Sequence, residues 1–336
     1  MKLFVFVFKY RFRRSAFNNF LKIKNLNNYR ILDLSGPLKY YLIGFPLLIL
    51  NKLLLSKSIV FISCDGKPFL KNNGVNIWFG GTSLKTSELF RNKQNNCYVL
   101  ENFYKKEKNL IRFAPTSINK TLLKKNFQII YLSEIRVNPS EKVKKIWKDN
   151  KTKIMKNFLI IEKKDFWKKY KINNFEEIQK DYIQVRNLIR LETVIELKKK
   201  FKKRFRIFGN TWKDYVKDVE ESNYDKKFIK KLYSGNLCLD FGSKWGSEAL
   251  YPRSIEIIEN GGTLLQAEQK NSKEIFGKNS KELIFSSIID LKKKISKIEK
   301  NNGDYFVKLI NLNKKKFEKI NEKTLKKIRD ISLNSF

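Results

Sequence analysis

Short apolar runs alternate with longer helical stretches along nearly the whole chain, and this alternation restricts the fold more than any other feature. Most of the runs are rich in Ile, Leu, Val and Phe without strict alternation, which is typical of strands buried on both faces. The predicted strands are Leu3–Phe8, Ile31–Leu34, Ser58–Ser63, Asn76–Phe79, Tyr98–Leu100 and Leu110–Phe113, then Gln128–Leu132, Phe205–Phe208, Asn236–Asp240, Thr263–Gln266 and Glu282–Phe285. The repeated order of strand, helix and strand predicts an α/β fold with parallel sheets covered by helices.

The two series of strands predict two α/β domains, because 336 residues exceed the usual size of a single core. The boundary is expected at Ala114-Pro115, where a strand gives way to a proline turn and the residue before proline favours an extended backbone. The predicted parts are a domain over 1–115, a domain over 116–310, and a basic helix over 311–336. A basic helical insertion, Ser140 to Lys203, is expected in the second domain.

The charge of the chain is strongly positive: 72 Lys and Arg stand against 33 Asp and Glu, a formal net charge of +39. Such a charge favours anionic partners, namely phosphate-bearing substrates, anionic membranes or nucleic acid. Lys, Asn, Ile and Phe are enriched together, as an AT-rich genome would impose, so the charge alone does not identify a function.

The absence of histidine excludes Ser-His-Asp and Cys-His relays and histidine metal sites. The three cysteines, Cys64, Cys97 and Cys238, lie far apart and fit neither a zinc cluster nor a CxxC motif. Any acid–base chemistry must therefore use Asp, Glu, Tyr or Lys.

Two apolar segments bear on the expected location of the protein. Leu3–Phe8 precedes basic residues instead of following them, so we expect a buried strand and not a secretory signal. Tyr41–Leu55 is interrupted by Pro46 and Lys52 and is shorter than the about 20 residues that span a bilayer. We expect a buried core helix there, with a helix that dips into one membrane leaflet as the alternative. The expected location is the cytoplasm, with peripheral attachment to the inner face of the membrane under that alternative.

The most informative segment runs from residue 205 to 297, and a polar loop at its centre leads into a short helix. Pro252 suits the first helical position, where its missing N–H costs nothing. Arg253 and Ser254 then lie in the first turn, beside free backbone N–H groups and the positive end of the helix dipole. This end favours a diphosphate, to which Arg253 can add bidentate contacts.

Further residues of the same helix suggest how a nucleotide would be held. Glu256, one turn in, can accept hydrogen bonds from the two hydroxyl groups of a ribose. Gly261 and Gly262 end the helix and allow a sharp turn into the next strand.

The order of these pieces resembles the C-terminal domain of group 1 glycosyltransferases. The likeness rests on the Pro-Arg-Ser-x-Glu helix, the Gly-Gly turn, the TLLQ strand, a Glu-x-Phe-Gly piece and ELIF, and it is closest to the branch related to the spore-maturation protein CgeB. It covers about half of the chain, roughly Ile111 to Lys300. It implies the GT-B architecture of two facing Rossmann-like domains, and metal-independent transfer of a hexose-like sugar from a nucleoside-diphosphate donor.

The resemblance also implies roles for individual residues. Glu248 and Glu256 match the Glu-x7-Glu spacing of retaining GT-B enzymes, in which the second Glu binds ribose and the first lies near the donor sugar. Arg190 and Lys244 would reach the phosphates. The loop here reads ALYPRSI where the family is rich in Gly and Phe, and the usual histidine of the first domain is missing, so the stereochemistry stays open.

In the first domain, Asp65 follows the apolar run SIVFISC and is expected at the carboxyl end of a parallel sheet, where ligands bind in open α/β folds. It is the candidate catalytic base. No Asp-x-Asp motif is present, and we expect neither a metal nor a cofactor beyond the nucleotide sugar as co-substrate. The expected acceptor is a glycan or a lipid-linked sugar in bacterial surface-polysaccharide assembly, reached from an anionic membrane surface.

Two other functions compete with this interpretation. The segment KKDFWKKYK interleaves lysines with aromatic residues, as a nucleic-acid-binding surface would, but no known nucleic-acid motif is present and the basic residues are spread along the chain. We therefore expect no nucleic-acid partner and keep that function as the alternative. A GT-B-like subunit that has lost catalysis and serves as a scaffold is the other.

Overall fold

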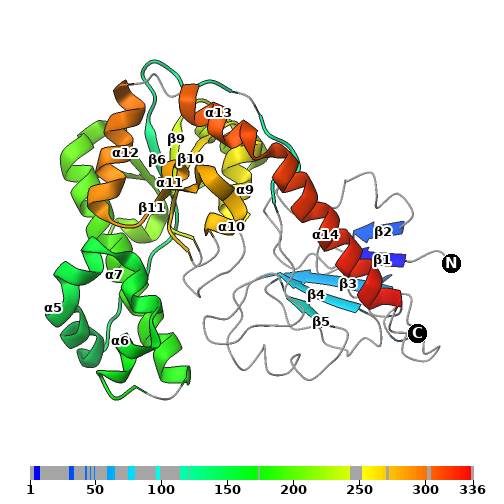
Figure 1. Cartoon of the computed structure of the whole chain (residues 1–336), viewed down its shortest axis with the longest axis horizontal. Coiled ribbons are helices and arrows are strands. Elements are labelled where there is room, and N and C mark those ends of the chain that lie inside the picture. The colour runs from blue at the N-terminus through cyan, green and yellow to red at the C-terminus, as the bar shows by residue number, and fades with distance from the viewer. Residues whose placement is uncertain are drawn as a thin grey trace. The chain divides into compact units, whose positions relative to one another are not determined.

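The computed structural model describes five short strand segments before residue 114, the single residues 42, 43, 46 and 49, and most of the chain from residue 114 onwards (Figure 1). The described ranges from there are 114–119, 121–172, 175–242, 252–269, 272–300 and 304–333. The chain divides into two compact units, one made of Met1–Thr116 with Phe317–Phe336 and the other of Ser117–Lys316. Each unit contains an all-parallel sheet, which confirms the predicted α/β class.

The sheet of the first unit has the strand order β2-β1-β3-β4-β5. Its strands are β1 (Phe4–Val7), β2 (Arg30–Asp33), β3 (Ile59–Cys64), β4 (Val75–Phe79) and β5 (Asn96–Tyr98). Each pairs with its neighbours in parallel, and each lies within two residues of a predicted strand. The predicted strand Leu110–Phe113 lies outside the described residues.

The end of the chain also belongs to the first unit. Helix α14 (Lys314–Leu333) follows α13 (Asp304–Leu312), and from Phe317 onwards it is part of that unit. Asn321 of α14 is buried: its Oδ1 accepts a hydrogen bond from the Ala114 N–H (3.0 Å), and its Nδ2 donates to the carbonyl oxygens of Ala114 and Pro115 (3.1 and 3.4 Å). One side chain thus fixes the backbone at 114–115 to the last helix.

The sheet of the second unit has the strand order β11-β10-β9-β6-β7-β8, with all neighbours parallel. Its strands are β6 (Ile129–Leu132), β7 (Phe205–Phe208), β8 (Val219–Glu220), β9 (Leu237–Asp240), β10 (Thr263–Ala267) and β11 (Ile284–Phe285). Every residue of β6, β9 and β10 is buried, as runs without strict alternation of polar and apolar residues predict. The predicted strand over 282–285 is wrong in its first half, because Glu282 and Leu283 end a short helix.

Helices cover this sheet on both faces (Figure 1). The insertion between β6 and β7 consists of α5 (Glu141–Lys156), α6 (Lys164–Lys168) and α7 (Phe175–Phe201), which confirms the predicted helical insertion. The remaining helices are α8 (Lys226–Tyr233), α9 (Pro252–Glu259), α10 (Ser272–Phe276), α11 (Ser280–Leu283) and α12 (Ile288–Lys300). In Figure 1, α7 and α12 lie on one side of the sheet and α9 and α10 on the other.

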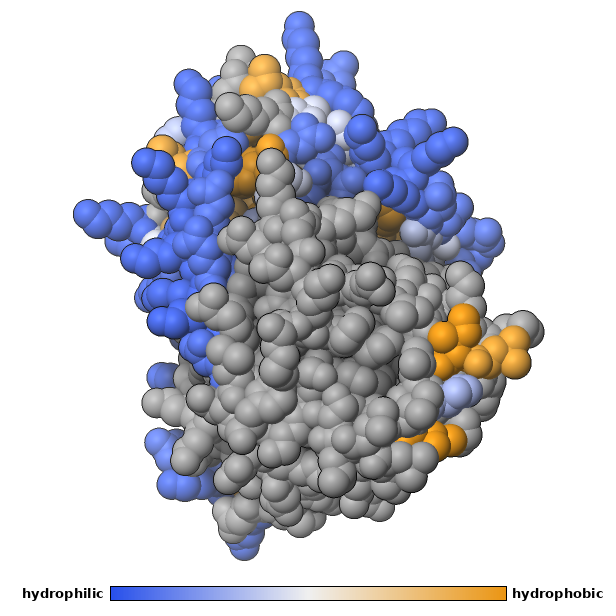
Figure 2. All heavy atoms as spheres, turned by 90° about the vertical axis from the view of Figure 1, so that its right-hand side faces the viewer, coloured by the Kyte–Doolittle hydropathy of each residue, from blue (hydrophilic) through white to orange (hydrophobic). Residues whose placement is uncertain are grey.

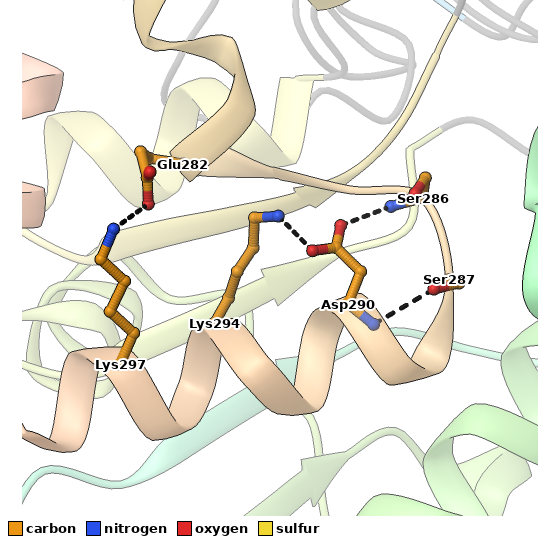
Figure 3. A network of polar contacts seen from close by, with 6 residues as sticks. All are labelled: Glu282, Ser286, Ser287, Asp290, Lys294 and Lys297. Atoms are coloured by element: carbon orange, nitrogen blue, oxygen red, sulfur yellow. Dashed lines mark hydrogen bonds and ion pairs between the residues drawn. The ribbon is translucent and has the colours of Figure 1, made fainter.

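The start of α12 is fixed by a reciprocal cap (Figure 3). The Asp290 N–H donates to Ser287 Oγ (3.1 Å), and the Asp290 carboxylate accepts from the Ser286 N–H (3.1 Å) and pairs with Lys294 one turn later. Lys297 pairs with Glu282 of α11 (2.9 Å). Because these contacts hold residues 286 and 287 against the first turn of α12, the short loop between β11 and α12 is fixed in position.

The apolar segment 41–55 differs from its prediction at the positions that the structure describes. Residues 42, 43, 46 and 49 are helical, but they are exposed: Leu42 to 68%, Ile43 to 43% and Ile49 to 39%. Figure 2 shows orange, apolar atoms exposed on the face of the molecule that it views. The expected burial is therefore wrong at these residues. None of the described helices is long and apolar enough to cross a membrane.

Candidate active site

The second sheet has a switch point between β6 and β9. From β6 the chain continues to β7 and β8 on one side, and then to β9, β10 and β11 on the other side of β6. In open parallel sheets, ligands bind outside the carboxyl ends of the strands at such a point. The candidate site is therefore the edge formed by the carboxyl ends of β6 and β9, with the helix ends that reach it.

Two arginines of α7 reach this edge. Arg186 and Arg190 lie one helical turn apart, and both are buried. The Arg186 guanidinium donates to the Phe241 carbonyl oxygen (2.6 Å) and the Arg190 guanidinium to the Gly242 carbonyl oxygen (3.2 Å), directly after β9. Within the described residues neither arginine forms an ion pair. Two buried positive charges in this position favour a bound anion.

Asp240, the last residue of β9, connects this edge to α9. It is fully buried, and its carboxylate accepts hydrogen bonds from Ser254 Oγ (2.5 Å) and from the Gly242 N–H (3.0 Å). Gly242 has φ +70°, a conformation that favours glycine. The hydroxyl of Ser254, predicted as a donor-binding group, thus serves to fix the first turn of α9 against the end of β9.

Arg253 and Glu256 of α9 are buried together with Tyr233 of α8. Burial raises the pKa of Tyr233 well above its usual value of 10; the negative charge of Glu256 raises it further, and Arg253 opposes this. The three groups are therefore close enough to interact electrostatically. The Tyr233 hydroxyl has no hydrogen-bond partner among the described residues, so it is a donor left for a ligand or for ordered water.

Glu134, just after β6, organises the neighbouring loop. Its carboxylate accepts hydrogen bonds from the N–H groups of Asn210 (3.2 Å) and Thr211 (3.0 Å) and from the hydroxyls of Thr211 (2.6 Å) and Ser222 (3.2 Å). Partial burial alone would raise the pKa of Glu134, but these hydrogen bonds outweigh it and lower the pKa below the usual 4.5. The side chain therefore stays ionised and fixes the loop after β7 beside β6.

The predicted glycines lie elsewhere. Gly261 and Gly262 follow the C-terminal end of α9 and precede β10, so they are at the opposite edge of the sheet from Asp240. Gly261 has φ +77°, and a Cβ there would lie 2.4 Å from Thr121 Oγ1. A Cβ on Gly262 would lie 2.8 Å from the Ile257 side chain. Both glycines are required by packing at this turn, and the structure does not place them beside Arg190 or Ser254.

Of the other predicted site residues, Asp65, Lys244 and Glu248 lie outside the described residues. Their roles stay predictions. Arg190 and Ser254 are linked through the end of β9, because Arg190 donates to Gly242 and both Gly242 and Ser254 donate to Asp240. Arg253 and Glu256 lie on the same helix as Ser254 and interact electrostatically with Tyr233. Arg186, Asp240 and Glu134 were not predicted, although the i, i+4 spacing of Arg186 and Arg190 could have revealed the first.

Fold and site together define a Rossmann-like α/β domain with a positively charged switch point. Residues 189–305 match the model of a family described as glycosyl transferase-like. The match includes Arg190, β9, α9 and β10, whereas Arg186, Glu134 and β6 precede it. It supports glycosyl transfer as the general chemistry. A comparison with curated proteins gives no match.

Proposed function

We propose that the chain transfers a hexose-like sugar from a nucleoside-diphosphate donor to a glycan or lipid-linked acceptor. The observation that carries the proposal is the pair of buried guanidinium groups, Arg186 and Arg190, at the switch point of a glycosyltransferase-like domain. A diphosphate supplies the two to three negative charges that such a pair favours. A neutral ligand would leave both charges buried and uncompensated, which is costly.

The remaining donor contacts follow from the same geometry. The N-terminus of α9 adds backbone N–H groups and the positive end of its dipole, so the diphosphate would be neutralised by protein groups and not by a metal. Glu256, one turn along α9, would accept hydrogen bonds from the ribose hydroxyls, and Arg253 and Lys244 would add charge. The proposal also places Glu248 near the donor sugar and assigns Asp65 as the catalytic base. It further assigns the chain to the CgeB-like branch and gives it a role in surface-polysaccharide assembly.

The test is a calorimetric titration with UDP, GDP, CMP and dTDP, repeated on Glu256→Ala. One nucleotide should bind with micromolar affinity, and the variant should bind it about 100-fold more weakly, because two hydrogen bonds to a charged group are removed. Glu274→Ala, the same change on α10, is the control and should bind like the wild type. If none of the four nucleotides binds, the donor proposal is wrong, and a scaffold or nucleic-acid role takes its place.

Peripheral attachment to an anionic membrane is part of the proposal. Its support is the exposure of Leu42, Ile43 and Ile49, three large apolar side chains of the apolar stretch 41–55, in a chain of net charge +39 (Figure 2). Apolar side chains that enter the interface and basic residues that attract anionic headgroups act together in such attachment.

Co-sedimentation with vesicles that contain phosphatidylglycerol tests the membrane contact. Replacing Leu42, Ile43 and Ile49 by serine should lower binding at least tenfold, because about 0.8 kcal/mol is lost for each buried methylene. A control triple variant changes three exposed apolar residues of the other unit, Leu122, Ile289 and Leu312, to serine. Equal losses in the two triple variants would show that the segment has no special role.

The structure bears on the nucleic-acid alternative. Trp167, the centre of the basic aromatic segment, is fully buried, and its indole N–H donates to the Ile161 carbonyl oxygen (2.7 Å). It cannot stack on a base without unfolding α6. An open groove of about 520 Å³ does carry five lysines, Lys200, Lys292, Lys293, Lys297 and Lys300, but Lys292 and Lys297 are paired with Glu196 and Glu282. These observations favour the donor-binding proposal.

A further inference from the structure

Two buried glutamines at the carboxyl end of β10 have side-chain atoms without hydrogen-bond partners among the described residues. Gln266 is 1% exposed and Gln269 is 6% exposed. Among the described residues, Gln266 Oε1 and both polar atoms of the Gln269 carboxamide have no hydrogen-bond partner. Buried amides are almost always paired in native proteins, because leaving one unpaired sacrifices the hydrogen bonds that it makes to water. Three unpaired atoms within four residues call for a ligand or ordered water.

The position of Gln266 is fixed by the register of the sheet. Gln266 is paired with Asp240 of β9, and residues in register on neighbouring parallel strands point to the same face. Asp240 meets Ser254 of α9 on that face. Gln266 therefore lies on the α9 side of the sheet, one strand away from the Asp240–Ser254 contact.

Gln269 lies directly against the candidate site. A Cβ on Gly242 would be 1.4 Å from Gln269 Nε2, so the amide occupies the space beside that glycine. Arg190 contacts the same glycine, because its guanidinium donates to the Gly242 carbonyl oxygen (3.2 Å). The Gln269 main chain is also fixed, because its N–H donates to Ser272 Oγ (2.9 Å) and its carbonyl accepts from the Ser272 N–H (3.0 Å). The unpaired amide is thus held in place next to an arginine of the site.

The chemistry of a carboxamide restricts what it binds. It offers two donors and one acceptor and carries no charge. Phosphate oxygens only accept, so they would satisfy Nε2 and leave Oε1 facing another oxygen. A hydroxyl group both donates and accepts, so neighbouring hydroxyls satisfy both atoms. The arginines suit the diphosphate, and the amides suit an uncharged, hydroxyl-bearing group next to it.

We propose that Gln269, with Gln266, binds hydroxyl groups of the donor sugar and thereby selects a neutral sugar with free hydroxyls. The assignment rests on the proposed function, since it takes the diphosphate at Arg186 and Arg190 as its starting point. Gln269 is in this account a specificity-determining residue, because a sugar without hydroxyl groups at these positions would leave the buried amide unpaired.

The experiment compares nucleotides with and without the sugar. Wild type and Gln269→Leu are titrated with UDP and UDP-glucose, GDP and GDP-mannose, and dTDP and dTDP-glucose. The variant should bind the sugar conjugate of the preferred nucleotide about tenfold more weakly than the wild type does, and bind the nucleotide alone with unchanged affinity. Gln128→Leu, the same change just before β6 at the opposite edge, should alter neither affinity.

Each outcome separates the assignment from the proposed function. Unchanged affinity for the sugar conjugate in Gln269→Leu overturns the assignment and indicates that water fills the subsite. An equal loss for nucleotide and conjugate also overturns it, because the side chain would then act on the nucleotide or on the packing around Gly242. If the wild type binds none of the six ligands, the proposed function itself fails.

Discussion

Changing Arg186 and Arg190 together to glutamine should lower the affinity for the preferred nucleoside diphosphate by more than 100-fold. Each guanidinium is buried at the carboxyl end of β9, and a hydrogen bond to a charged group contributes about 1.5–3 kcal/mol. Loss of two such contacts, at 1.4 kcal/mol for each factor of ten, exceeds two orders of magnitude. Calorimetric titration of the double variant measures the change directly.

The control for this prediction removes the same charge elsewhere in the unit. Arg204 is paired with Glu299 and Arg206 with Glu220, so their double change to glutamine also lowers the net charge by two. We expect that control to bind the nucleotide within about threefold of the wild type, since surface charge contributes only a screened attraction. Similar losses in both double variants would mean that overall charge, and not the arginine pair, governs binding.

Asp240→Ala should destabilise the Ser117–Lys316 unit by about 3 kcal/mol. The change leaves Ser254 Oγ and the Gly242 N–H without their acceptor, and both contacts are buried. Urea unfolding followed by circular dichroism measures the loss. Because Asp240 also fixes α9 and the end of β9, nucleotide affinity should fall in the same variant.

Two further variants separate this contact from ordinary helix capping. Asp225 is the exposed N-cap of α8, and its carboxylate accepts two backbone hydrogen bonds. Asp225→Ala should lower the free energy of unfolding by only about 1 kcal/mol. The double change Ser254→Ala with Asp240→Ala should lower the free energy of unfolding by less than the sum of the two single changes. The reason is that the Ser254 hydroxyl, which Asp240→Ala alone leaves unpaired, is absent from the double variant. Strict additivity would contradict a direct Asp240–Ser254 contact.

The fold followed from the sequence where strands are mostly apolar and mostly buried. β6, β7, β9 and β10 are runs of four or five residues in which the polar residues are Arg206, Asp240, Thr263 and Gln266, and such runs between helical stretches are distinctive. β8 and the start of β11 could not be found in this way. Each has two residues, and in β11 the apolar pair directly follows a helix, so no period identifies the boundary.

The site was predictable in part. Arg253 and Glu256 followed from the first turn of a helix that begins with proline, and Arg190 followed from the resemblance. Asp240 could not be recognised, because an aspartate after an apolar strand is common and only the fold places Ser254 beside it. Gln269 gave no signal at all, since a lone glutamine acquires meaning only from burial without a partner.

The helix α14 has a consequence for biosynthesis. The first unit is made of the first 116 residues and the last 20, and Asn321 of α14 holds the backbone of Ala114 and Pro115. All of Ser117–Lys316 is therefore translated before that helix exists. The strands of the first unit therefore cannot gain this helix until the whole of Ser117–Lys316 has been synthesised. The second unit has its full sequence before the first unit does.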